Sequence, residues 1–314
     1  MAKVLVLSAT GKQGSATVRA LLSSSQKHSI RALVRDASSE KAKALVAQGV
    51  EVLQGGDWDK DVASLEKATA GVEVVFFISN PNLTDWDAEV RSATNIVDVA
   101  KRAGTVKHVV YSTVAGMDRY QEIPGLDALP FFRNYWDSKA KGEELVKAGG
   151  FAHYTILRPT EFMSNWTDRA TITFQMPDLL SEGVWHTALP ESFKLTEIDP
   201  HDIGRLAAAA IDAPATFAGG PSRVLYVAGE LLTVGELLAQ LSAAAGKKLA
   251  ISTYTPEEAK KVAEKNPVVA GQLARLEWQA SPKPANDYGL GFRTFRDHLK
   301  AHKDEVVELY KHLP

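Results

Sequence analysis

Apolar and polar positions along the first half of the chain alternate between two periods. Short, mostly apolar runs suit buried strands, and they occur at residues 4–7, 30–34, 50–53, 74–78, 106–111 and 153–157. Between them, apolar residues recur with the period of a helix, which predicts helices after residue 14 and over about 39–48, 62–68, 84–103 and 134–148. This repetition predicts an α/β fold, a doubly wound parallel sheet with right-handed crossovers.

The regular pattern weakens after Pro159, where aromatic residues and prolines mix with short segments. We therefore predict a sheet domain over residues 1–158 and a smaller mixed C-terminal lobe over 159–314. We expect the chain to return from this lobe to the sheet near residues 196–211 and 223–228.

Helix signals also occur in this second half. Thr233 precedes Glu236 by three residues, which predicts a capping box, and Asp199 or Asp202 can cap a helix over 202–211. Two more helices are expected over about 256–265 and 294–309. The irregular segment 116–133 is long enough to form a lid, and its role stays open.

A glycine turn follows the first strand, in the sequence Ser8-Ala9-Thr10-Gly11-Lys12-Gln13-Gly14. Strand, glycine turn, helix and strand form a βαβ unit that places a pyrophosphate at the helix N-terminus. Gly11 would let the backbone approach the phosphates, and Gly14 would let the helix pack closely on the strand. Ser8 stands where the first glycine of the motif is expected, so an ordinary strand-to-helix turn is the alternative.

Composition narrows the class of protein further. The 314 residues are 45% hydrophobic and 24% charged, as in ordinary soluble proteins, and the net charge of -2 gives no electrostatic reason to expect nucleic acid or an anionic membrane as a partner. The absence of cysteine excludes a disulfide, a thiol nucleophile and a thiolate metal site. Neither a signal segment nor an apolar run of about twenty residues is present, so a cytoplasmic location is expected.

Tyr135 and Lys139 lie four residues apart in an expected helix and therefore share one of its faces. The lysine charge favours the phenolate form and so lowers the pKa of the tyrosine. The tyrosine hydroxyl can then give its proton to a carbonyl oxygen as hydride reaches the carbonyl carbon. Lys139 can also donate to the ribose of a cofactor. Because Tyr-x-x-x-Lys arises easily by chance, an exposed helix pair is the alternative.

Several segments, in this order, resemble the NmrA-like branch of the atypical short-chain dehydrogenase/reductase superfamily, and the resemblance covers most of the chain. The matching segments are residues 9–14 (ATGKQG), 31–36 (RALVRD), 56–59 (GDWD), 135–139 (YWDSK), 157–165 (LRPTEFMSN) and 199–204 (DPHDIG). The resemblance implies an NAD(P)-binding Rossmann lobe and a small C-terminal lobe that closes over a cleft.

Two departures from this family pattern affect the expected activity. Ser8 replaces a glycine, and the catalytic serine or threonine of short-chain reductases falls near Thr113, although another register puts Val114 there. NmrA-like regulators often lack the active-site tyrosine, which this chain has as Tyr135. Because the family includes non-catalytic nucleotide sensors, the resemblance leaves enzyme and sensor open.

The second strand ends in Arg35-Asp36, where a carboxylate would select NAD and a cation would select NADP. Neighbouring strand residues point to opposite sides, and the family pattern favours Arg35, whose guanidinium can bind a 2′-phosphate in bidentate fashion; Lys12 adds a second cation. We therefore expect NADP (NADPH); a solvated Arg35 is the alternative. The expected cofactor contacts are Thr10, Gly11, Lys12, Gln13, Gly14, Arg35, Asp57, Trp58, Ser79, Asn80, Ser112, Lys139, Pro159, Thr160 and Phe162, and the expected catalytic residues are Tyr135, Lys139 and Thr113.

Other candidate residues point to chemistry less directly. His298 and His302 have the spacing of two metal ligands on a helix, but Leu299 stands where a metalloprotease glutamate would be, so no metal site is expected. Asp57 and its acidic neighbours suit a loop cap or an adenine contact, and core packing is the alternative for Phe162.

Two functions remain. The first is an NADPH-dependent reductase of a small carbonyl, enone or imine substrate, favoured by Tyr135 and Lys139. The alternative is a non-catalytic NADP(H)-sensing regulator that binds a protein partner. Neither nucleic acid nor a membrane is expected as a partner. The substrate's identity, the stereochemistry and the oligomeric state stay open.

Overall fold

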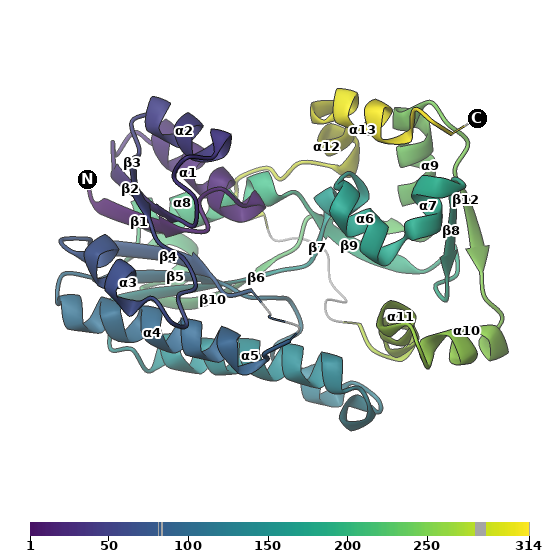
Figure 1. Cartoon of the computed structure of the whole chain (residues 1–314), viewed down its shortest axis with the longest axis horizontal. Coiled ribbons are helices and arrows are strands. Elements are labelled where there is room, and N and C mark those ends of the chain that lie inside the picture. Colours follow the sequence, from purple (N-terminus) through teal and green to yellow (C-terminus); the bar gives the residue numbers. More distant parts are fainter. Residues whose placement is uncertain (81, 83, 280–286, 314) are drawn as a thin grey trace. The chain divides into compact units, whose positions relative to one another are not determined.

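A computed structural model describes residues 1–80, 82, 84–279 and 287–313. The chain divides into two compact units, drawn in Figure 1. Unit 1 consists of Met1–Met117, Asn134–Pro159 and Pro200–Tyr226, and unit 2 of Asp118–Arg133, Thr160–Asp199 and Val227–Pro314. The chain therefore passes between the units several times, and each unit combines distant segments of the sequence.

Unit 1 is built on a seven-stranded sheet in the order β10-β6-β5-β4-β1-β2-β3. Strands β1 to β6 pair in parallel, and the order reverses direction at β1, which confirms the predicted doubly wound fold. The strands are β1 (Lys3–Leu7), β2 (Ser29–Val34), β3 (Glu51–Gln54), β4 (Val74–Ile78), β5 (His108–Ser112), β6 (His153–Pro159) and β10 (Ser222–Val227).

Helices cover both faces of this sheet (Figure 1). They are α1 (Lys12–Ser23), α2 (Glu40–Ala47), α3 (Val62–Thr69), α4 (Asp87–Ala103), α5 (Pro130–Lys147) and α8 (Pro200–Asp212), with the short turn η4 (Phe217–Gly219). Helices α1 and α8 pack on one face, and α3, α4 and α5 lie on the other. The contact between α1 and α8 is close at Gly204, where a Cβ atom would lie 2.3 Å from the carbonyl carbon of Ala16.

Unit 2 contains a three-stranded mixed sheet and a two-stranded parallel sheet. The first consists of β11 (Glu230–Thr233), β9 (Lys194–Ile198) and β7 (Glu161–Phe162), and the second of β12 (Ala250–Thr253) and β8 (Val184–Thr187). Its helices and turns are η1 (Tyr120–Glu122), η2 (Leu126–Ala128), η3 (Met163–Trp166), α6 (Arg169–Gln175), α7 (Pro177–Ser181), α9 (Val234–Ala245), α10 (Pro256–Ala263), α11 (Pro267–Glu277), α12 (Phe295–Ala301) and α13 (Lys303–Tyr310).

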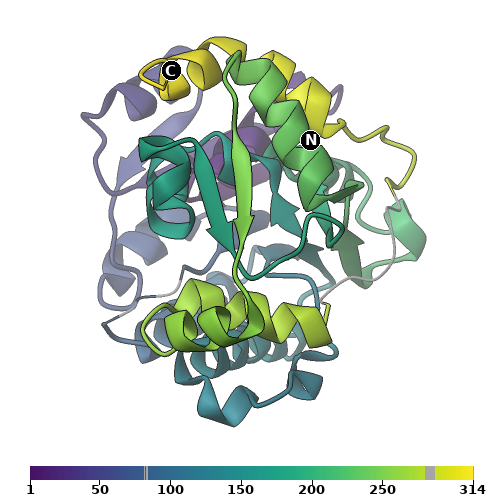
Figure 2. The same ribbon diagram turned by 90° about the vertical axis from the view of Figure 1, so that its right-hand side faces the viewer.

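Unit 2 has its own hydrophobic core, made of other residues than the core around the sheet of unit 1. Buried leucines of α9 pack with Phe295 of α12 and Tyr310 of α13, and with Trp166 and Trp185. Figure 2 shows α9, α12 and α13 gathered at one end of β12, and α10 and α11 at the other end.

Several sequence expectations can be compared with these elements. The capping box of Thr233 and Glu236 is confirmed at the start of α9. Helix α4 begins at Asp87, three residues after the expected start, and α5 begins at Pro130, four residues before it. The single helix expected over 294–309 is wrong, because the chain breaks at His302 into α12 and α13.

Candidate functional site: a glycine turn and a buried lysine in unit 1

The turn after β1 is closed by two glycines and a serine in an unusual conformation. Ser8 has a positive φ of 57°, and its carbonyl accepts the backbone N–H of Gly11 at 2.9 Å. A Cβ atom on Gly14 would lie 2.1 Å from that carbonyl oxygen, so position 14 has room for glycine alone. Ser8 thus adopts the left-handed conformation that a glycine takes at low cost, and the turn forms despite the substitution.

The start of α1 is suited to an anion. Gly11 is the N-cap of α1 and, having no side chain, cannot itself accept the first N–H groups of the helix. These N–H groups and the helix dipole favour negative charge at this end. Gln13, in the first turn, is buried and accepts the hydroxyl of Ser112 at 2.6 Å, which joins two expected cofactor residues at the ends of β1 and β5.

Arg35 and Asp36 lie in different surroundings just after β2. A Cβ atom on Gly56 would lie 2.7 Å from Cγ of Arg35, so the arginine stem lies over the glycine that follows β3. The Asp36 carboxylate instead accepts the backbone N–H and the hydroxyl of Ser38, and these hydrogen bonds lower the pKa of Asp36. The exposed Arg35 side chain therefore lies just beyond the carboxyl end of β2, whereas the Asp36 carboxylate is hydrogen-bonded within its own turn.

Two further expected residues follow β3. Asp57 has a positive φ of 52°, and its carbonyl accepts backbone N–H groups at positions 60 and 61. Trp58 is half-buried against the sheet core, and its carbonyl accepts the side-chain amide of Asn95 on α4. Asp61 caps α3 through the N–H of Ser64, so at least one acidic side chain of this loop is a helix cap, as expected for the group.

Lys139 is buried within unit 1, with 4% of its surface exposed. Its ammonium lies 2.6 Å from Oε1 of Glu89, donates to the backbone carbonyl of Ser79 at the end of β4, and lies 5.7 Å from the ring centroid of Tyr135. Tyr135 is half-buried, and its ring meets that of Trp136 edge to face. The predicted shared face of Tyr135 and Lys139 is thus present, with the lysine inside the fold.

Glu89 was not expected from the sequence. It is 2% exposed on α4, and it accepts the hydroxyls of Ser79 and Ser138 at 2.7 Å each in addition to the Lys139 ammonium. Its position four residues before Ala93 on the buried face of α4 is the signal that could have revealed it.

Tyr111 extends this network into the sheet. Its hydroxyl lies 2.5 Å from that of Ser79, its ring stacks on Phe77, and burial raises its pKa. A Cβ atom on Gly142 of α5 would lie 2.4 Å from the Tyr111 hydroxyl oxygen, so the glycine makes room for it.

The hydroxyl of Thr113 is engaged in a second buried network. It donates to Oε1 of Glu143 at 3.0 Å and contacts the carbonyl of Leu157. Arg158 donates two hydrogen bonds to the same glutamate, and Lys147 forms an ion pair with it. Burial opposes the charged form of Glu143, but these cations outweigh it and lower the pKa of the carboxyl.

The remaining expected residues lie around the ends of β4 and β6. Asn80 is exposed, and the Pro159 carbonyl accepts the N–H of Ala115 within unit 1. Thr160 and Phe162 belong to unit 2, where Thr160 donates its N–H to the carbonyl of Val227 and Phe162 is half-buried in β7. Thr10 is half-buried in the glycine turn, and Lys12 is exposed at the start of α1.

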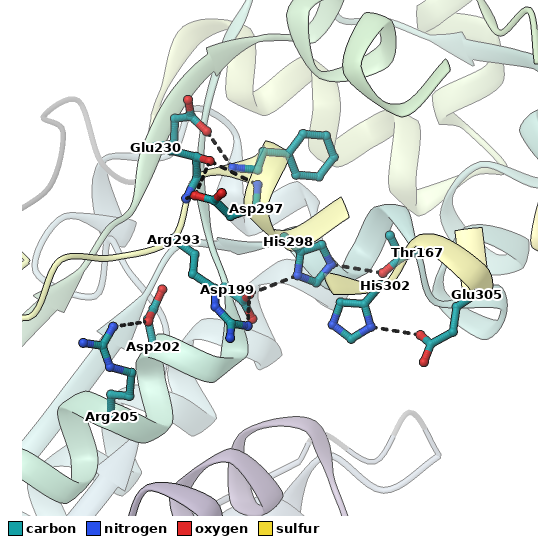
Figure 3. A network of polar contacts seen from close by, with 12 residues as sticks. Thr167, Asp199, Asp202, Arg205, Glu230, Arg293, Asp297, His298, His302 and Glu305 are labelled. Carbon is teal, nitrogen blue, oxygen red and sulfur yellow. Dashed lines mark hydrogen bonds and ion pairs between the residues drawn. The ribbon is translucent and has the colours of Figure 1, made fainter. Parts of the chain in front are cut away.

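The two histidines of the C-terminal helices are paired with protein groups (Figure 3). Nδ1 of His298 lies 3.2 Å from Asp199, and Nε2 lies 3.2 Å from the hydroxyl of Thr167. His302 lies beside Glu305. Across the ranges that the structure describes, no cluster of three or more His, Asp or Glu side chains is arranged to hold a metal ion.

Unit 2 contains a buried carboxyl group, that of Glu197, with incomplete hydrogen bonding among the described residues. Glu197 on β9 is 1% exposed, and it accepts the indole N–H of Trp166 on Oε1, while Oε2 has no hydrogen-bond partner among the described residues. Burial, together with the neighbouring charge of Glu161 on β7, raises the pKa of Glu197 to about 8.

A doubly wound sheet with a glycine turn leading into an uncapped helix start defines the class of nucleotide-binding Rossmann-type proteins. The chain belongs to the NmrA-like family, whose family model matches residues 1–278. It is 31% identical over 258 residues to the NAD(P)H azoreductase of Xenophilus azovorans, a match that covers 82% of this chain and 79% of that protein. Three further curated relatives are matched over 33%, 49% and 61% of their own length.

Solved structures share the fold over nearly the whole chain. The triphenylmethane reductase of Citrobacter sp. complexed with NADP(H) is 23% identical with a TM-score of 0.71, covering 95% of this chain and 99% of that one. The negative transcriptional regulator NmrA in complex with NADP is 19% identical with a TM-score of 0.67, covering 100% and 92%. The curated relatives include both the NAD(P)H azoreductase and the nitrogen metabolite repression protein NmrA of Emericella nidulans, which is 26% identical over 204 residues and covers 64% of this chain and 54% of that protein. In the described part of the chain, no helix is long and apolar enough to cross a membrane.

Proposed function

We propose that this protein is an NADPH-dependent reductase of a small carbonyl, enone or imine compound. The observation that carries the proposal is the buried Lys139 ammonium, which lies at the end of β4 and 5.7 Å from the centroid of the Tyr135 ring. The glycine turn after β1, which leads into a helix start without a side-chain cap, supports it. The reductases among the relatives support it.

The residues present suit a dinucleotide phosphate. Gly11 and Gly14 let the start of α1 pack directly against the Ser8 carbonyl, and the first turn of α1 would supply N–H donors for the pyrophosphate. Arg35 would hold the 2′-phosphate, with Lys12 as a second cation. NADPH, when bound, supplies the hydride that reduces the substrate.

The chain's own residues supply the proton. Tyr135 would donate its hydroxyl proton to the carbonyl oxygen or imine nitrogen as the adjacent carbon gains hydride, so that one hydride and one proton are added together. Lys139 would stabilise the resulting phenolate and donate to the ribose. Thr113 is a weaker candidate for a direct role, because its hydroxyl already donates to Glu143.

The test follows NADPH absorbance while a panel of aldehydes, quinones, enones, imines and azo compounds is supplied. We expect substrate-dependent oxidation of NADPH that far exceeds that of NADH. A protein that binds NADPH with micromolar affinity or better, yet oxidises it with no member of the panel, would contradict the reductase.

That negative outcome would favour the second candidate, an NADP(H)-sensing regulator with a protein partner. The engaged Thr113 hydroxyl is the observation in its favour, since it removes the usual third catalytic group of short-chain reductases. The fold does not separate the two candidates, because the regulator NmrA shares it.

A further inference from the structure

The ammonium of Lys139 lies inside unit 1, where the Glu89 carboxylate is its ion-pair partner. Among the described residues, its partners are the Glu89 carboxylate at 2.6 Å, the Ser79 carbonyl and the face of the Tyr135 ring. The two side chains of the ion pair are 5% and 1% exposed. Water therefore does not replace Glu89 as the group that balances the lysine charge.

Glu89 is itself fixed from several sides. The hydroxyl of Ser79 donates to Oε1, and that of Ser138 donates to Oε2. Ser79 is held in turn by its contact with Tyr111, whose hydroxyl occupies the space left by Gly142. Residues of α5 and of the ends of β4 and β5 therefore hold the carboxylate of α4 in place.

We propose that Glu89 is the counter-ion that keeps the Lys139 ammonium charged and fixed at the end of β4. A lone buried ammonium is strongly disfavoured in a low-dielectric interior, and such a group loses its proton rather than remain charged. Glu89 is thus a positioning residue, which acts through Lys139. Its effect on catalysis rests on the proposed reductase function, but its effect on the charge of Lys139 does not.

The test uses the full-length Glu89→Gln variant, which removes the charge and preserves the shape. Lysine side chains labelled with ¹³C at Cε are titrated by NMR, and the Lys139 resonance is assigned by its loss in Lys139→Met. We expect Lys139 of the variant to lose its proton at least about two pH units below the parent. The alkaline limb of kcat/KM for NADPH oxidation should move down in parallel, with activity recovered at lower pH.

Glu143→Gln is the matched control. Glu143 is equally buried on α5, but its ion pairs are with Arg158 and Lys147 rather than with Lys139. Its loss should reduce stability without moving the Lys139 titration. Glu89→Asp keeps the negative charge and should keep Lys139 protonated over the parent's pH range.

Unchanged titration of Lys139 in Glu89→Gln would overturn the proposal. If that variant does not fold, the double variant Glu89→Gln/Lys139→Met, which removes both charges, should fold again, since an unpaired buried charge is what destabilises the single variant. A double variant that also stays unfolded would overturn the proposal as well. If no panel compound is reduced, only the proposed function fails, because the NMR titration needs no turnover.

Discussion

At the scale of a single residue, we propose that Arg35 sets the preference for NADPH over NADH. Its stem lies over Gly56, and its exposed guanidinium ends at the sheet edge, while its neighbour Asp36 is engaged by Ser38. A side chain in this position can discriminate only through a group that NADPH has and NADH lacks, which is the 2′-phosphate.

Arg35→Ala should weaken NADPH binding about 10- to 100-fold, the equivalent of roughly 1.5–3 kcal/mol for a charge-assisted hydrogen bond, and leave NADH binding nearly unchanged. Calorimetric titration of both cofactors measures this. Asp36→Ala is the control in the adjacent position, and it should keep the parent's preference. Equal affinity of the parent for the two cofactors would rule out this role for Arg35.

We expect Glu197 to make the free energy of unfolding depend on pH. Its pKa is raised from 4.5 to about 8 in the folded protein, so the folded state binds more protons than the unfolded state between these values. The free energy of unfolding should therefore fall as pH rises from about 4.5 to 8, by at most about 1.4 kcal/mol per pH unit, and this contribution should be constant above 8.

Glu197→Gln should remove this slope, because the amide does not titrate. Urea unfolding of parent and variant at a series of pH values checks the prediction, with the difference between the two proteins as the measured quantity. Parallel curves across the whole interval would show that Glu197 does not carry the effect.

At the scale of elements, the β1 turn and the start of α1 pack closely on each other. A Cβ atom at position 14 would lie 2.1 Å from the Ser8 carbonyl oxygen, which is part of the backbone and cannot rotate away. The helix would have to move off the strand, and the phosphate-binding geometry would move with it.

Gly14→Val should destabilise the protein by about 1–3 kcal/mol or more and abolish NADPH binding. Ser8→Gly is the opposite control, because Ser8 has a positive φ, and it should stabilise the fold by about 1 kcal/mol and retain binding. Thermal unfolding and NADPH titration report both effects. A folded valine variant that binds NADPH normally would show that the phosphate site lies elsewhere.

Sequence periodicity was enough to predict most of these elements. Alternating apolar runs and amphipathic helices specify a parallel sheet, and local signals such as the Thr233 capping box specify helix starts. The break at His302 was missed because the apolar pattern continues across it, from Leu299 to Val306.

Some residues of the candidate site can likewise be predicted from the sequence, and others cannot. Gly11, Gly14, Tyr135 and Lys139 follow from local spacing. Glu89 does not, because a glutamate in a helix is usually solvated, and its burial depends on a lysine fifty residues away in the sequence. The engagement of Thr113 by Glu143 is likewise set by tertiary pairing of β5 with α5.

At the scale of the whole molecule, the relatives of this chain include a reductase and the NmrA repression protein, and solved structures of both kinds share its fold. Architecture and cofactor binding are common to both, so neither separates them. The difference must lie in whether a proton donor acts on a bound substrate. We propose that Tyr135 is that proton donor in this chain.

The measurement that tests this most directly compares NADPH oxidation by the parent and by Tyr135→Phe, with the same acceptor and with NADPH affinity determined for each. We predict that turnover falls about 10²- to 10⁴-fold in the variant, as for loss of a general acid, while the dissociation constant for NADPH changes little. Undiminished turnover in Tyr135→Phe would contradict the account, because the proton would then come from another group.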